Sequence, residues 1–387
     1  MMVFFIARSM LICKDNKLAY LCKYGSCIMG MKKSFESASL SAMTLREKVG
    51  QLFVIRPESL DMSIRWEQYP ELDAYSLQEV NEGMRAVNAQ YPVGGVVLFG
   101  QNIKDEAQLT RFLGQLRALQ GSPLLYADEE GGRVSRVASH EEIDVERFKS
   151  MASIGASGDP ASAYHCGNVI GTYLKRFGFD IDFAPVADVN TNPFNTVISD
   201  RAFSSDPDVV ARMVTSYLEG LHKAGIIGCV KHFPGHGDAL HDTHLGYAES
   251  TKTWDEMLRC EMIPFRAAMD WGCQLVMTAH IAAPNVTGSR IPATLSSIIL
   301  TDKLRKELGY QHIIVTDAME MGAIRQYYTD ADAAVESIRA GADLVACPKD
   351  FVGSFEAVLA AVEHGYISEE RIDESVRRVL ALKHKDY

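Results

Sequence analysis

Histidines and acidic residues are concentrated in one short stretch of the chain. It reads Lys231-His232-Phe233-Pro234-Gly235-His236-Gly237-Asp238 and continues, after two residues, with His241-Asp242-Thr243-His244. Four of the eleven histidines therefore fall within thirteen residues, and the interspersed glycines and proline predict a shaped loop rather than a helix. Such a loop suits either of two chemistries: binding of a metal ion, or proton transfer by His244 with Asp242 orienting its ring.

The end of the first predicted strand helps to choose between these chemistries. Metal-dependent barrel hydrolases usually carry a His-x-His pair there, whereas this strand ends in Val54-Ile55-Arg56-Pro57. Acid–base chemistry is therefore favoured, and we expect no metal and no other cofactor.

Two further groups of polar residues directly follow apolar segments. After residues 123–127 comes Asp128-Glu129-Glu130-Gly131-Gly132-Arg133-Val134-Ser135-Arg136. Its carboxylates suit the vicinal hydroxyls of a polyhydroxylated ligand, and an ion-pair network within the loop is the alternative. After residues 312–316 comes Asp317, which suits catalysis at a barrel mouth, although taken alone its position slightly favours capping of the next helix. The histidine-rich loop, two strands away, favours the catalytic interpretation.

The elements that must position these residues alternate in type along the chain. Short apolar runs predict strands at 51–55, 93–99, 123–127, 179–186, 226–231, 274–280, 312–316 and 342–347. Helical spacing of apolar residues predicts helices at about 103–120, 160–177, 206–224, 254–271, 330–340, 351–364 and 368–384. This α/β pattern predicts a single (β/α)8 barrel of the TIM type over residues 44–387, with an open doubly wound sheet as the alternative.

Two segments do not fit the repeating pattern. Residues 1–43 are predicted to be an extension outside the core, and a degenerate export signal is the alternative. The long connection 56–92 is either a lid over the site or a surface insertion with a helix of its own.

Composition excludes several classes of protein. Lys and Arg number 39 against 50 Asp and Glu, a net charge of -11, and no basic run appears that would suit nucleic acid. No apolar segment is long and unbroken enough to span a membrane. The eight cysteines form no C-x-x-C pair, which indicates reduced thiols and favours a cytoplasmic location.

The motifs taken together resemble glycoside hydrolase family 3, and within it the β-N-acetylhexosaminidase branch. They are DEEGGRVSR, FAPVADVNTNPFN, KHFPGHGDALHDTH, VMTAHI, PATLS and VTDAMEM, in this order, and the resemblance covers about residues 44–385. One departure is the Asp242-Thr243-His244 triplet, where the family commonly has Asp-Ser-His.

The resemblance implies a role for each matching residue. Asp317 would be the nucleophile of a retaining mechanism, and Asp242 with His244 would be the acid–base pair, since the chain has no room for the second domain that supplies a glutamate in other branches. Five residues would hold the sugar: Asp128, Arg136, Arg201, Lys231 and His232. His236 and Asp238 match the loop motif, where a structural role and direct contact are equally open.

The implied activity is removal of terminal β-linked N-acetylglucosamine from glycans such as peptidoglycan fragments. Two alternatives are phosphorolysis of the same linkage and a non-catalytic glycan-binding barrel. The expected partner is a small carbohydrate substrate. The oligomeric state is open, with a monomer favoured.

Overall fold

The computed structural model describes residues 40–63, 75–239 and 248–383. The chain divides into two compact units, residues 1–43 and 44–387, and the following description concerns the second. The predicted extension, residues 1–43, lies outside the described residues except for its last four positions.

Eight parallel strands form the centre of the second unit, and each overlaps one of the predicted segments. They are β1 (Phe53–Ile55), β2 (Gly95–Leu98), β3 (Leu124–Ala127), β4 (Ile181–Asp182), β5 (Ile227–Phe233), β6 (Leu275–Thr278), β7 (Ile313–Val315) and β8 (Val345–Ala346). All eight strand predictions are therefore confirmed.

The strands close into a barrel. Consecutive strands pair from β1 to β7, and β1 also pairs with β8, with Phe53 opposite Val345. A parallel bridge between Val315 and Leu344 joins β7 to β8. The structure therefore confirms the single (β/α)8 barrel. It excludes the open doubly wound sheet, because such a sheet reverses its strand order and leaves two unpaired edges.

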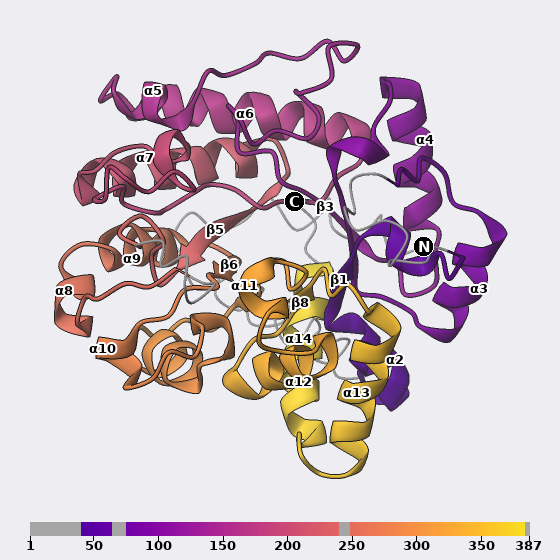
Figure 1. The fold of residues 1–387 in the computed structure, drawn as a ribbon. Helices are drawn as coiled ribbons and strands as arrows, with labels where there is room; N and C mark the ends of the chain where they lie inside the picture. The colour runs from indigo at the N-terminus through magenta and orange to yellow at the C-terminus, as the bar shows by residue number, and fades with distance from the viewer. Residues whose placement is uncertain (1–39, 64–74, 240–247, 384–387) are drawn as a thin grey trace, which may run out of the picture. The chain divides into compact units, whose positions relative to one another are not determined.

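Helices surround this barrel (Figure 1). The α-helices are α2 (Leu45–Gln51), α3 (Glu82–Gln90), α4 (Glu106–Arg117), α5 (Met151–Gly155), α6 (Pro160–Phe177), α7 (Pro207–Lys223), α8 (Trp254–Leu258), α9 (Met262–Trp271), α10 (Pro284–Thr287), α11 (Gly322–Arg325), α12 (Asp330–Ala340), α13 (Phe351–Glu363) and α14 (Glu369–Lys383). Short 3-10 turns are η1 (Pro57–Leu60), η3 (Gly100–Asn102), η4 (Ser199–Arg201) and η5 (Ala293–Leu295). None of these helices is long and apolar enough to cross a membrane.

The helix predictions are confirmed with two refinements. The predicted helix 254–271 is divided into α8 and α9, and the π-helix η6 (Ile298–Glu307) was not predicted. In η6 the amide of Leu308 donates to the carbonyl of Lys303, five residues back, and apolar residues in so wide a turn do not follow the usual 3.6-residue spacing. Within the connection 56–92, helix α3 supports the interpretation as an insertion with its own helix.

Close packing of α6 against α7 positions the loop that follows β3. A Cβ on Gly167 would lie 2.2 Å from the carbonyl oxygen of Tyr217, so only glycine allows the two helices to approach this closely. The phenol of Tyr217 then reaches inward and donates to the backbone carbonyl of Glu129 at 3.2 Å. The outer helices therefore position the first polar loop of the site.

Candidate active site

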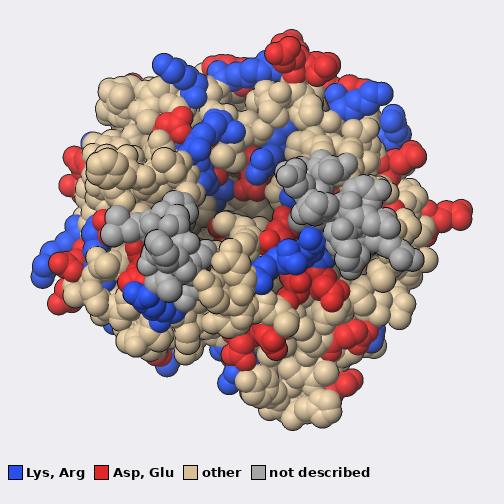
Figure 2. Space-filling model, viewed as in Figure 1, with Lys and Arg blue, Asp and Glu red and all other residues tan. Residues whose placement is uncertain are grey.

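A cavity of about 290 Å³ lies at the carboxyl ends of the strands. Figure 2 shows a hollow in this face of the molecule, bordered by basic and acidic side chains. All six predicted site residues that lie in the described part of the chain line the cavity: Asp128, Arg136, Arg201, Lys231, His232 and Asp317. The structure thus brings together residues that are up to 189 positions apart in sequence (317 minus 128), as the barrel fold predicted.

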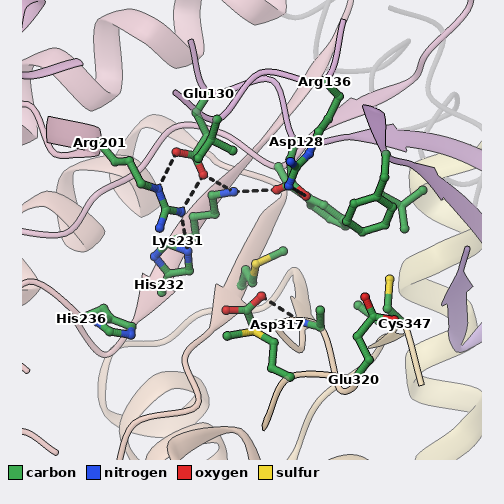
Figure 3. Close-up of a pocket in the computed structure, with 18 of the residues that line it drawn as sticks. Asp128, Glu130, Arg136, Arg201, Lys231, His232, His236, Asp317, Glu320 and Cys347 are labelled. Atoms are coloured by element: carbon green, nitrogen blue, oxygen red, sulfur yellow. Dashed lines mark hydrogen bonds and ion pairs between the residues drawn. The ribbon is translucent and has the colours of Figure 1, made fainter. Parts of the chain in front are cut away.

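Four charged side chains form the cavity cluster: Asp128, Glu130, Arg201 and Lys231. The ammonium of Lys231 lies 2.7 Å from Oδ1 of Asp128 and 2.6 Å from Oε1 of Glu130. Arg201 binds Glu130 through two parallel hydrogen bonds of 2.8 and 2.7 Å (Figure 3). Both carboxylates therefore have cationic partners, and the two-point Arg201 contact fixes the guanidinium in one orientation.

Electrostatics keeps Glu130 and Lys231 charged. Burial alone would raise the pKa of Glu130, but the adjacent Lys231 and Arg201 hold it well below its usual range. Burial alone would lower the pKa of Lys231, but Asp128 and Glu130 raise it above its ordinary value. The cavity therefore presents fixed charges, which can bind the hydroxyls of a polar ligand without reorganisation.

The consecutive residues Asp128, Glu129 and Glu130 face different surroundings. Asp128 and Glu130 line the cavity, whereas Glu129 is fully buried behind it. The carboxylate of Glu129 accepts the backbone N–H groups of residues 136–138 at 2.6, 2.7 and 3.0 Å and the hydroxyl of Tyr173 at 2.7 Å. Glu129 therefore folds the loop that carries Arg136.

The hydrogen bonds of His232 define its protonation pattern. Arg201 lies 3.2 Å from Nε2 of His232, and because a guanidinium can only donate, Nε2 accepts this bond. The ring proton of the neutral imidazole is then on Nδ1, which donates to Asp188 at 2.6 Å. Burial would raise the pKa of Asp188, but His232 and His236 lower it overall. With both nitrogens engaged, His232 suits positioning better than proton donation.

Asp317 emerges from the end of β7 at the cavity wall. Its Oδ1 accepts the backbone N–H of Ala318 at 2.8 Å. Burial would raise the pKa of Asp317, but the nearby His232, His280, the Ala318 N–H and Lys231 lower it overall. Asp317 is therefore ionised near neutral pH, the state that a nucleophilic carboxylate requires.

One wall of the cavity is built around Phe99. The guanidinium carbon of Arg56 lies 3.7 Å from the centre of its ring, and that of Arg136 lies 5.2 Å from it. Arg56 is buried and pairs with Glu320 at 2.9 Å. This wall ties the loops after β1, β2, β3 and β7 together and supports the predicted sugar ligand Arg136.

The model of the glycosyl hydrolase family 3 N-terminal domain matches residues 44–382. The chain belongs to glycosyl hydrolase family 3. Membership confirms the family that the motifs indicated.

Named relatives agree with the family assignment. The Beta-hexosaminidase A of Pseudoalteromonas piscicida is 34% identical over 327 residues, 77% of this chain and 54% of that protein. The Beta-hexosaminidase of Nitrosomonas eutropha is 36% identical over 260 residues, 65% of this chain and 73% of that protein. The glycoside hydrolase family 3 β-N-acetylglucosaminidase from Paenibacillus sp. str. FPU-7 has a TM-score of 0.79 at 37% identity, over 88% of this chain and 62% of that one. The chain thus spans about half the length of the Pseudoalteromonas protein.

The acid–base pair implied by family 3, Asp242 and His244, lies outside the described residues, so its role stays a prediction. The structure does place the residues before it. His236 lines the cavity, while Asp238 accepts hydrogen bonds from the hydroxyls of Thr191 and Ser250, both at 3.2 Å. The contacts of Asp238 indicate a structural role, whereas the position of His236 at the cavity suits direct contact with a ligand.

Sequence reasoning gave no individual role to Glu130, which lines the cavity, or to Asp188, which is buried and binds His232. The available signal was the position of both acids shortly after predicted strands; the ion pair of Glu130 with Lys231 is seen only in the structure. Phe99 and Glu320 carried no such signal, because a lone aromatic at a strand end and a lone acid in a loop have many roles. Within residues 40–63, 75–239 and 248–383, no three histidine, cysteine or acidic side chains form a group that could hold a metal ion.

Proposed function

We propose that this protein is a retaining β-N-acetylhexosaminidase that removes terminal β-linked N-acetylglucosamine from glycans such as peptidoglycan fragments. The family and the names of its relatives support a glycoside hydrolase of this type. The observation that carries the proposal is the ionised Asp317 at the cavity wall, beside a cluster of fixed charges suited to sugar hydroxyls.

In the first step, the sugar binds with its hydroxyls against the cavity cluster and Arg136. A carboxylate oxygen of Asp317 bonds to the anomeric carbon, and the bond from that carbon to the glycosidic oxygen breaks. The leaving oxygen takes a proton from His244, which Asp242 orients. A terminal sugar is thereby held as an ester of Asp317 while the rest of the glycan departs.

In the second step, His244 accepts a proton from water as the water oxygen bonds to the anomeric carbon. The ester bond to Asp317 breaks, and the sugar leaves with its original anomeric configuration. His232 stays bound to Asp188 and Arg201 through both steps, because these partners engage both of its nitrogens.

A trapping experiment tests the nucleophile and the sugar preference together. The protein is incubated with a 5-fluoro N-acetylglucosaminide bearing a good leaving group, then analysed intact and after peptide digestion by mass spectrometry. We expect one added sugar on Asp317 and none on the Asp317→Asn variant, with Asp302→Asn as a labelled control. A label on a different residue would contradict the mechanism.

Product analysis separates the proposal from its alternatives. Incubation of an N-acetylglucosaminide with and without phosphate should give free N-acetylglucosamine in both cases. A sugar 1-phosphate as the main product would make the protein a phosphorylase. Binding without any product would indicate a glycan-binding barrel.

A further inference from the structure

Phe194 stands out among the large apolar side chains of the described residues. Its side chain is 86% exposed, whereas Ile198, in the same loop, is fully buried. It lies in the connection between β4 and α7, and two other residues of this connection, Val197 and Arg201, line the cavity. A strongly exposed phenylalanine so near a ligand cavity is an informative exception to burial.

The backbone around Phe194 is fixed by many hydrogen bonds. The side chain of Asn192 accepts the N–H of Phe194 at 3.0 Å, and the side chain of Asn195 accepts the N–H groups of Val197 and Ile198, both at 3.0 Å. Arg133 binds the carbonyls of residues 196, 197 and 198 at 3.0, 2.7 and 3.2 Å. The exposure of Phe194 is therefore held by the loop and does not result from a loose chain.

The loop that carries Phe194 is tied to a residue of the cavity wall. The amide of Asn195, the next residue, donates to the carbonyl of His236 at 2.7 Å, and His236 lines the cavity. Met321, from the loop after β7, lines the same cavity and is 40% exposed. The loop of Phe194 is therefore joined to the cavity wall, and Met321 is an exposed apolar side chain among those that line the cavity.

The size of the cavity indicates what lies outside it. About 290 Å³ is at the small end of the range for ligand pockets, roughly 300–1,000 Å³, so it holds one sugar ring rather than two. The proposed reaction cleaves the bond between that ring and the next, so the next ring must lie at the edge. One face of a pyranose ring presents C–H groups, which pack favourably on an aromatic ring.

We propose that Phe194 forms an aglycone subsite, in which its ring stacks on the sugar that follows the scissile bond. This inference rests on the proposed function and extends it, because it commits the leaving group to be a pyranose rather than a small alcohol.

The test compares two substrates that differ only in the aglycone. We would measure kcat/KM for the β-1,4-linked disaccharide of N-acetylglucosamine and for its methyl β-glycoside. For Phe194→Ala the ratio of the two values should fall about 3- to 10-fold, mainly through the KM for the disaccharide. Phe194→Trp should restore the ratio, because it keeps an aromatic face. Hydrolysis of the trapped sugar on Asp317 should keep its rate, since the aglycone has already left.

The matched control is Trp271→Ala, which removes another partly exposed aromatic from the end of α9, on the opposite face of the barrel, and should leave the ratio unchanged. An unchanged ratio in Phe194→Ala, or an equal loss for both substrates, would overturn the subsite while leaving the proposed function standing. If the wild-type protein cleaves neither glycoside, the proposed function fails, and the subsite fails with it.

Discussion

The two ends of the barrel both hold buried charges, but they use them differently. At the cavity end, two carboxylates and two cations form the cavity cluster, and Asp128 keeps part of its surface accessible. At the opposite end, the fully buried carboxylate of Asp343 is surrounded by Arg305, Arg371 and Arg378. We call these four residues the Asp343 cluster.

The partners of Asp343 occupy both of its oxygens. Oδ1 accepts from Arg378 at 2.8 Å and from the hydroxyl of Ser375 at 2.7 Å, and Oδ2 accepts from Arg305 and from the backbone N–H of Ile314. Arg371 in turn donates to the carbonyl of Ala342 at 2.7 Å. This cluster joins α14 and η6 to the sheet and offers no carboxylate oxygen to a ligand.

The difference between the ends teaches that burial and ion pairing alone do not identify a functional site. Both clusters contain carboxylates whose pKa is lowered by adjacent cations, despite burial that would raise it. What differs is which groups face a cavity. All four members of the cavity cluster line the 290 Å³ cavity, whereas at the opposite end a cavity of about 280 Å³ is lined by Arg378 but not by the fully buried Asp343. We therefore expect substitutions at the cavity end to change activity and substitutions at the Asp343 end to change stability.

The largest effect is expected for Asp317→Asn. Loss of the nucleophile should lower kcat/KM by at least about 1,000-fold, while the midpoint of thermal unfolding stays within about 2 °C of the wild type. Kinetics on a chromogenic N-acetylglucosaminide and calorimetry check the two parts, with the exposed Asp302→Asn as control. A near-wild-type rate would remove Asp317 from the chemistry.

Asp343→Asn should give the opposite profile. Removal of one charge leaves the three arginines without their anionic partner, so the free energy of unfolding should fall by about 3–5 kcal/mol. The kcat/KM of the remaining folded protein should stay within about twofold. Denaturant titration and assays well below the unfolding temperature measure both. A large loss of activity in fully folded protein would break the comparison between the two ends.

The variant Glu130→Gln should affect both activity and stability, and so lie between Asp317→Asn and Asp343→Asn. The amide cannot neutralise Lys231 and Arg201, so Lys231 should shift toward Asp128 and compete with the substrate for it. We expect KM to rise about 10-fold and stability to fall by about 1–3 kcal/mol. Glu106→Gln, in an exposed pair with Arg176, is the control and should change neither quantity measurably. If Glu130→Gln lowered the stability without raising KM, the role of Glu130 would be structural, like that of the Asp343 cluster.

The smallest effect is a pH dependence at the Asp343 end. Its folded-state pKa is lowered, so its contribution to stability is complete above the unfolded value of about 3.9 and is lost as the pH falls toward the folded value. The difference in unfolding free energy between wild type and Asp343→Asn should therefore be constant from pH 5 to 7. It should shrink by up to about 1.4 kcal/mol per unit below pH 4. A constant difference down to pH 3 would contradict the lowered pKa.

The sequence predicted the barrel well because apolar strands and amphipathic helices alternate strongly. The predicted helix 206–224, for example, agrees with α7, which Asp206 caps and Pro207 begins. It also predicted which polar residues meet, because residues that follow parallel strands share one end of a barrel. It missed η6 because a π-helical turn departs from the usual spacing. It gave no individual role to Glu130, Asp188 or Phe99, since the contacts between loops are set only when the barrel closes.

The tripeptide Asp128-Glu129-Glu130 has a genetic consequence. Alternation along the extended backbone directs Asp128 and Glu130 to the cavity and Glu129 into the protein, where it winds the loop that carries Arg136. A change at Glu129 would therefore act on ligand recognition at a distance, through the conformation of Arg136, without removing any atom from the cavity. In a screen for loss of binding, all three neighbouring codons would score as a single site, although one of them never meets the ligand.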